Sequence, residues 1–559
     1  MSTSRTSAVF LLVCALAVPT PARQAVRSEL RFDASAAEHL LNRAGFGASP
    51  EEIERAVEDG LEATVLRLLS PDDDPLPPYF ERIRRRSAMR DRAGEEELTE
   101  AERRKLQNRI RRDDRDQLSD FLDWWMEQLI ESEHPLRERM TLFWHGHFTS
   151  SMDDVKNSHE MIQQVLLLRG HSLGNFRELV HAIARDPAML EYLDNDVNRR
   201  DHPNENFARE LMELFTLGEG NYTEDDVQEA ARAFTGWSDS DGAFRFNGKQ
   251  HDHGPKTVFG VTAKMDGDEV IDLILDRPDC ARFLAGELVT YFEGATPEEA
   301  RLERLAGVLY DADYDLPTLL QALFTDPDFY RADVRGARIA SPIDFLVGST
   351  RRLQADPPAY LLLLAANLLG ERLLFPPNVK GWEGGAAWVT TSSLMQRGNL
   401  AGVLLGEVTM EDFLDYDIDE VLDPTMLAED EDVAMDGMSG SMQADDGLAR
   451  EAMDDKRALG ELRRLRDIRK SWTPRMNLTG AVRGADARSD EEVVDALVDR
   501  LLAIDVDAET RATLTRLLER EREAIACSEE EFLEHSWRSE RPLRRLAHVI
   551  LSLPEAQLH

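Results

Sequence analysis

The chain has 559 residues, of which 42% are hydrophobic and 31% are charged, so it is long enough to bury a large core and does not have the composition of a disordered protein. Its formal net charge is −41 and its pI is near 4.7. This acidity argues against nucleic acid or an anionic membrane surface as a partner, because binding either one needs Lys and Arg clustered on one face.

The first 25 residues have the pattern of a secretory signal peptide. Arg5 precedes an apolar run over residues 8–18, and small or helix-breaking residues follow at 19–22. The run is too short to span a bilayer. We therefore expect residues 1–25 to be removed and the mature protein to be periplasmic or secreted, with no integral membrane segment. A buried N-terminal helix is the alternative, but the charged residues that follow do not support it.

Helical periodicity and capping signals recur along the chain, whereas strand signals are scarce. One strand is indicated at residues 243–246, where the Asn247-Gly248 dipeptide predicts a hairpin turn and a return strand near 258–259. The fold class predicted is mainly α, a large multi-helix body with a small β-hairpin excursion. Helices are expected at 36–44, 50–60, 99–129, 135–148, 158–169, 173–184, 188–193, 204–215, 268–275, 278–292, 297–310, 316–323, 342–353, 357–369, 392–405, 491–504, 508–526 and 541–551.

The organisation into domains follows from changes in composition. We expect a helical body over residues 35–407. Residues 426–455 are acidic and aperiodic, which predicts a disordered insertion. The helices of 456–559 are expected to pack back on the body. Cys280 and Cys527 would be the cysteines left after cleavage, too few for a disulfide-dense scaffold, and one bridge between them is left open.

Several sequence blocks resemble, in the same order, the bacterial family catalogued as domain of unknown function 1800. The resemblance covers most of the chain from about residue 34, apart from the acidic insertion. It implies an exported, mainly helical protein, often encoded beside a second uncharacterised exported protein that is then a possible partner, but no settled activity. The blocks are HLLNRAGFG at 39–47, TLFWHGHF at 141–148, NENFARELMELF at 204–215, His251-Asp252 with Lys256, and PNVKGW at 377–382.

The block at 204–215, taken as one helix, carries an apolar stripe on one side. Helical geometry places Glu210 beside this stripe and leaves Glu205, Arg209 and Glu213 on the opposite, exposed side. A half-buried carboxylate needs a cation, a hydrogen-bond donor or a proton. Glu210 is therefore the main candidate for a general base or metal ligand, and an ion pair with an Arg of a neighbouring helix is the alternative. Arg209 and Lys256 complete the candidate catalytic set.

Histidines and acids elsewhere could supply metal ligands. His145 and His147 point about 200° apart on a helix, so a two-histidine clip requires the helix to end near His145, which Gly146 permits. With His251, Asp252 and Glu210 these residues would suit Zn, Fe or Mn. The loop around Asp194 is rich in oxygen ligands and could hold Ca²⁺. The alternatives are core hydrogen bonds for the histidines, loop anchoring by His251 and Asp252, and turn capping by the Asx side chains.

No GxSxG, P-loop or dinucleotide motif is present, so covalent catalysis is disfavoured. Trp237, Trp382 and Trp388 have glycine-rich neighbours and could line a carbohydrate or peptide groove, or could belong to the core. Two functions follow. The first is a metal-dependent hydrolytic or other acid/base enzyme acting on an envelope or extracellular polymer, with a divalent metal (Zn, Fe, Mn or Ca) as cofactor. The second is a non-catalytic envelope assembly, export or binding partner protein.

Overall fold

The computed structural model describes residues 30–70, 76, 80, 99–240, 242–414 and 463–559. The expected signal peptide at 1–25 and the acidic insertion at 426–455 lie outside these residues. Contacts divide the chain into Met1–Arg31 and Phe32–His559, and the helices and strands that the structure describes all belong to the second unit.

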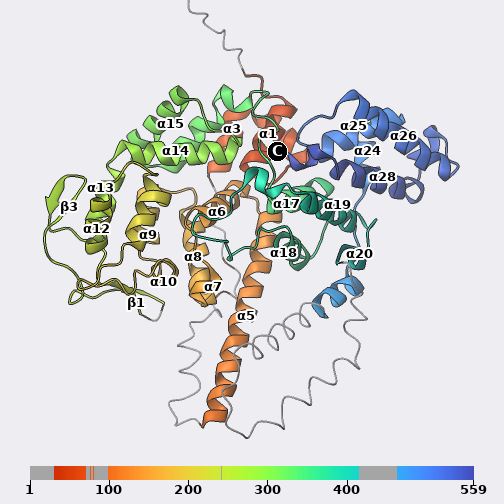
Figure 1. Ribbon diagram of the computed structural model, residues 1–559. Coiled ribbons are helices and arrows are strands. Elements are labelled where there is room, and N and C mark those ends of the chain that lie inside the picture. The colour runs from red at the N-terminus through yellow and green to blue at the C-terminus, as the bar shows by residue number, and fades with distance from the viewer. Residues whose placement is uncertain (1–29, 71–75, 77–79, 81–98, 241, 415–462) are drawn as a thin grey trace, which may run out of the picture. The chain divides into compact units, whose positions relative to one another are not determined.

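The first half of this unit is a succession of helices (Figure 1). The predicted capping boxes begin two of them: Ser49 and Glu52 exchange side-chain and backbone hydrogen bonds at the start of α2, and Thr99 and Glu102 do so at the start of α5. The helices are α1 (Ala34–Ala44), α2 (Pro50–Asp59), α3 (Leu61–Leu69), α5 (Glu100–Glu131), α6 (Pro135–His147), α7 (Met152–Val155), α8 (Ser158–His171), α9 (Phe176–Ile183), α10 (Pro187–Tyr192), α11 (Asn206–Glu210), the π-helix η2 (Leu211–Thr216) and α12 (Glu224–Ala233).

Two small antiparallel ribbons follow, β1 (Trp237–Asp239) with β2 (Phe244–Phe246), and β3 (Lys256–Val258) with β4 (Val261–Ala263). The predicted pairing of 243–246 with a return strand near 258–259 is wrong, because β2 pairs with the strand before it. The sequence also has Asp-Gly at 241–242, a hairpin dipeptide of the same kind as Asn247-Gly248, and Gly242 has a φ of 67°. The Asn247 N–H then donates to the Gly236 carbonyl at 2.7 Å and extends this pairing.

The second half is again helical, so the predicted mainly α fold is confirmed. None of the helices within the described ranges is long and apolar enough to cross a membrane. The elements are α13 (Gly267–Leu275), α14 (Pro278–Glu293), α15 (Glu299–Asp311), α16 (Leu316–Phe324), η3 (Pro327–Tyr330), α17 (Pro342–Leu353), α18 (Ala359–Leu368), η4 (Gly385–Trp388), α19 (Thr391–Leu405), α20 (Met410–Leu414), α24 (Leu478–Gly484), α25 (Asp490–Leu501), α26 (Ala508–Ala524), α27 (Glu529–Phe532), α28 (Ser536–Leu551) and η5 (Pro554–Gln557).

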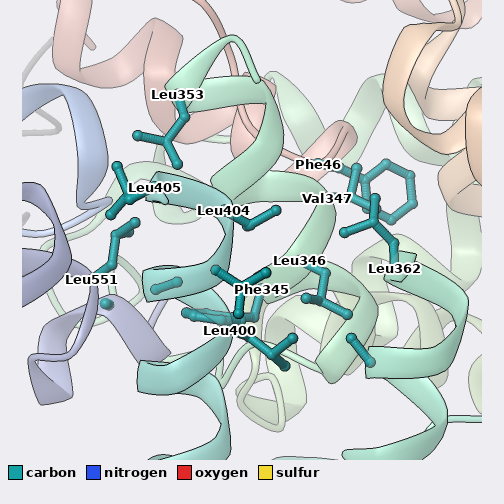
Figure 2. Close-up of a cluster of buried hydrophobic side chains, with 14 of the residues drawn as sticks. Phe46, Phe345, Leu346, Val347, Leu353, Leu362, Leu400, Leu404, Leu405 and Leu551 are labelled. Carbon is teal, nitrogen blue, oxygen red and sulfur yellow. The ribbon is translucent and has the colours of Figure 1, made fainter. Parts of the chain in front are cut away.

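Helix α17 is buried along nearly its whole length and joins the body to the C-terminal helices. Figure 2 shows Phe345 and Leu346 of α17 packed among Leu400 and Leu404 of α19, with Leu551 of α28 next to Leu405 of α19. Helix α25 also contacts α17, and α28 contacts α19. Since each buried side chain of this size stabilises the fold by roughly 2 kcal/mol, this cluster holds the C-terminal helices against the body.

Candidate functional site

A cavity of about 800 Å³ opens where three of the sequence blocks meet. Its wall is built from the end of α6, the π-helix η2 and the turn after it, α14, residues 337–341 and the loop 379–388. These segments are far apart in the chain, so the cavity is a product of tertiary packing. Its charged lining consists of Glu213, Glu219, Glu287, Glu371 and Glu383, with Arg338 and Lys380.

A close approach between the loop and the end of α6 forms one side of the cavity. The Thr149 hydroxyl donates to the Val379 carbonyl at 2.5 Å. Gly381 has a φ of 73°, and a Cβ atom there would lie 2.6 Å from the Gly146 carbonyl oxygen. Only glycine fits such a position, which explains the residue between Lys380 and Trp382. The contact places these two neighbouring side chains on the cavity wall.

His145 and His147 do not share a ligand position, because α6 does not end near His145 but continues to His147. The His145 Nε2 accepts the Leu374 N–H at 3.1 Å, and the ring packs against Trp125 in the core. The His147 Nε2 donates to the Phe215 carbonyl at 3.0 Å, and its side chain lines the cavity. Burial lowers the pKa of each imidazole to about 4, so both are neutral at neutral pH.

The NENFARELMELF block is not one α-helix, as predicted, since α11 gives way to the π-helix η2 after Glu210. The wider π turn changes which residues face inward. Met212 and Phe215 are buried, while Glu213 and Leu214 are half-buried and line the cavity. The prediction that Glu213 lies on an exposed face is therefore wrong. Its Oε2 accepts the Tyr222 hydroxyl at 2.7 Å.

Two carboxyls of the lining are poised to carry a proton. Glu371 is 5% exposed, and its Oε2 accepts the Ile343 N–H at 2.8 Å. Burial, with a smaller contribution from the charge of Asp344, raises the pKa of Glu371 to about 7. Glu287 is accessible from the cavity but surrounded by protein, and this partial loss of water raises its pKa as well. Such shifts are typical of proton-transferring sites and also occur in structural clusters.

The two cationic side chains of the cavity, Arg338 and Lys380, have N–H donors that no protein acceptor engages among the described residues. The Arg338 Nη2 lies 2.6 Å from the buried Asp344 carboxylate, and its guanidinium lies over the Tyr291 ring at 5.1 Å. Its Nη1 is buried and has no hydrogen-bond partner among the residues described. The Lys380 ammonium likewise forms no ion pair within the described parts of the chain. Both groups can therefore offer hydrogen bonds to a ligand.

Glu210, the main catalytic candidate from the sequence, is half-buried at the edge of this charged region. Burial raises its pKa, the charge of Glu213 adds to the rise, and the charges of Lys380 and Arg209 oppose it. Over the described residues Glu210 makes no ion pair with an arginine of a neighbouring helix, so the alternative prediction of such an ion pair is wrong. Glu210 is not part of the cavity lining.

The other predicted catalytic residues lie away from the cavity. Arg209 is paired with Glu224 at 2.7 Å and with Glu205 at 3.2 Å, near the surface. The Lys256 side chain is buried, and its ammonium donates to the carbonyls of Asp252 at 2.5 Å and Met265 at 2.8 Å, with Gly254 at 3.3 Å. Each of these cations is fully engaged in structural contacts.

The predicted metal ligands are not assembled. His251 Nδ1 donates to the Thr235 carbonyl at 2.8 Å, and the Asp252 carboxylate accepts from Arg232 at 2.8 Å, so both anchor a loop. Asp194 is exposed at a positive φ of 55°. Across the described ranges, no three His, Cys, Asp or Glu side chains are placed to hold a metal ion together. Cys280 and Cys527 are buried free thiols and form no bridge.

Sequence reasoning missed most of the cavity. For Trp382 and Trp388 the sequence allowed either a ligand groove or the core. Both side chains are half-buried and line the cavity. Lys380 belongs to the PNVKGW block at 377–382, but no other feature of the sequence indicated a functional role for it. Glu287 and Glu371 lie in ordinary helical or apolar surroundings, and no spacing or motif distinguishes them. Their neighbours give no signal either, since Glu287 lies between Gly286 and Leu288 and Glu371 lies between Gly370 and Arg372.

The fold and the site define a mainly helical protein with one large, acidic and aromatic cavity described on its body. The family model described as protein of unknown function (DUF1800) matches residues 39–558, and the chain belongs to this family. Among curated proteins and among solved structures, none matches the chain.

Proposed function

We propose that this protein is an exported enzyme that carries out acid/base hydrolysis of an envelope or extracellular polymer, and that the cavity is its active site. Export rests on the signal-like N-terminal sequence. The observation that carries the proposal is the placement of Glu371, whose pKa is raised to about 7, in one cavity with Glu287 and the unpaired Lys380. A general acid is most effective when its pKa is near the working pH.

The proposed reaction is a single displacement by water. Glu371 in its protonated form donates its proton to the leaving group as the bond to that group breaks. Ionised Glu287 accepts a proton from the water whose oxygen forms the new bond. Two carboxyls in different protonation states perform acid and base roles in this way in many hydrolases. Lys380 and the free Nη1 of Arg338 can donate hydrogen bonds to oxygen atoms of the substrate and so orient it between the two carboxyls.

This proposal uses the carboxylates and not the predicted metal ligands, because His145, His251, Asp252 and Asp194 do not line the cavity. His147 lines it as a neutral imidazole and positions the end of η2 through Phe215. Glu210 lies outside the cavity lining, and its charge interacts with that of Lys380 without forming an ion pair.

The test is hydrolysis of isolated envelope material by the full chain, measured as new reducing ends, carboxyls and amines. Glu371→Gln and Glu287→Gln keep the side-chain shape and abolish proton transfer by the side chain, so each is expected to lower the rate about 100-fold or more. Asp186→Asn is the matched control, because Asp186 is also a buried carboxyl with its pKa raised to about 7 but lies outside the cavity lining.

Unchanged rates in both glutamine variants, or no product from the wild type, would contradict the proposal. Binding of envelope material without product would favour instead the non-catalytic binding or assembly role.

A further inference from the structure

The cavity carries an excess of negative charge. Five glutamates line it, of which Glu371 holds a proton up to about pH 7, against Lys380 and Arg338, and Arg338 is already paired with Asp344. The side chains of Glu219, Glu287 and Glu383 form no hydrogen bond or ion pair within the described residues, so their charges face the cavity uncompensated. Since the whole chain has a net charge of −41, the local field attracts cations and repels anions.

Aromatic rings share the same wall. An aromatic face attracts an ammonium group through its quadrupole, and this attraction adds to that of a nearby carboxylate. The flat faces of tryptophan also pack against the apolar C–H face of a sugar ring. The aromatic lining consists of Phe143, Phe283, Tyr291, Trp382 and Trp388.

The backbone of the cavity favours a carbohydrate over a peptide. None of the lining residues belongs to a strand, so the wall presents no sheet edge that an extended peptide could join. Gly384 and Gly385 have open space where a Cβ atom would lie, and Gly384, Gly385, Ala386 and Trp388 all belong to the cavity lining. This part of the wall therefore combines an aromatic ring with a loop that carries no bulky side chain.

We propose that the cavity binds a carbohydrate that bears protonated amino groups. This inference rests on the proposed function and names its substrate class, an amine-bearing polysaccharide. The sugar rings stack on Trp382 and Trp388, and the ammonium groups lie against the unpaired glutamates. An N-acetylated sugar of the same length would keep the stacking and lose the charge.

The test is calorimetric titration of the full chain with two hexasaccharides of equal length, glucosamine hexamer and N-acetylglucosamine hexamer. At low salt and at a pH where the amines are protonated, the glucosamine hexamer is expected to bind at least tenfold more tightly. The difference is expected to shrink as salt is added, because exposed charges are screened.

Three variants locate the binding. Glu383→Gln is expected to weaken the glucosamine hexamer several-fold and to leave the N-acetylated hexamer unchanged. Trp388→Ala is expected to weaken both. Glu58→Gln removes the same charge from the exposed side of α2, outside the cavity, and is expected to change neither.

Equal or tighter binding of the N-acetylated hexamer, or no binding of the glucosamine hexamer, would overturn the inference. Tighter binding of hexalysine would assign the cavity to basic peptides and would overturn it too. Binding of the glucosamine hexamer without its cleavage, followed by mass spectrometry, would contradict only the proposed hydrolysis. Cleavage of envelope material with no preference for amines would contradict only the present inference.

Discussion

Two polar regions of the molecule differ in whether their charged side chains have protein partners. In the loop around Lys256, each polar side chain has a fixed protein partner: Lys256 has three carbonyls, Asp252 has Arg232, and His251 has Thr235. In the cavity, Lys380 and several glutamates have none among the described residues. Because Lys380 and the unpaired glutamates are exposed to water, they cost little to keep without a protein partner, and the second region is the one whose charged groups are available to a ligand.

The largest effect on stability is expected from substitution of Lys256, whose ammonium group is hydrogen-bonded to three carbonyls. Lys256→Met removes the buried ammonium and its hydrogen bonds to one buried and two partly buried carbonyls, so it is expected to lower the free energy of unfolding by about 4 kcal/mol, measured by chemical denaturation. Lys380→Met is the matched variant in the cavity. It is expected to leave stability nearly unchanged and to lower the rate of hydrolysis. The reverse pattern would contradict the comparison.

Protonation of Glu371 in the cavity makes the free energy of unfolding depend on pH. Its folded-state pKa of about 7 is above the ordinary 4.5, so the folded state holds the proton more tightly. The resulting stabilisation is fully present below about pH 4.5 and is lost as pH rises through 7, a change of about 3 kcal/mol. Glu371→Gln is expected to flatten this part of the stability profile, measured by denaturation from pH 4 to 8.

Asp186→Asn is the control for this experiment, because burial also raises the pKa of Asp186 to about 7. Removing this carboxyl is expected to flatten the pH profile of stability in the same way. Only Glu371→Gln is expected to change hydrolysis as well. An equal loss of hydrolysis in both variants would indicate that their effect acts through the fold and not through the cavity.

The aromatic wall is expected to contribute to binding and not to folding. Trp388 is half-buried and belongs to the short helix η4, so Trp388→Ala is expected to weaken the glucosamine hexamer about tenfold, or about 1.4 kcal/mol, with little change in denaturation midpoint. Trp537→Ala is the control, since Trp537 is 74% exposed and does not line the cavity. A large loss of stability in Trp388→Ala would place that ring in the core.

Local signals predicted most helices because caps and apolar spacing are properties of neighbouring residues. Ser49 and Thr99 begin their helices through contacts three residues away. The same local reasoning failed where two local signals competed. Two hairpin dipeptides lie within a few residues of each other, and the one at 241–242 pairs β2 with β1. The π turn at Leu211–Thr216 was missed because α and π turns need the same residue types.

The cavity was beyond the reach of the sequence for a different reason. Glu210 was correctly expected to be half-buried, since its helix face alone decides this. Glu287 and Glu371 acquire their raised pKa from surroundings supplied by segments far away in the chain. Whether Lys256 or Lys380 is left unpaired depends on which distant carbonyls and carboxylates the fold brings near. Periodicity carries no information about such contacts.

The smallest effect is expected at Arg209, which the sequence placed among the catalytic candidates. Its guanidinium is 31% exposed and pairs with Glu205 and with the more exposed Glu224. Ion pairs of this kind contribute less than about 1 kcal/mol each because water screens them. Arg209→Gln is therefore expected to lower the free energy of unfolding by less than about 1 kcal/mol and to leave hydrolysis within about twofold of the wild type. A loss of hydrolysis as large as that of Glu371→Gln would show that the NENFARE block acts directly in the reaction. It would also show that a side chain paired within the protein can still be catalytic, which contradicts the distinction drawn between the loop around Lys256 and the cavity.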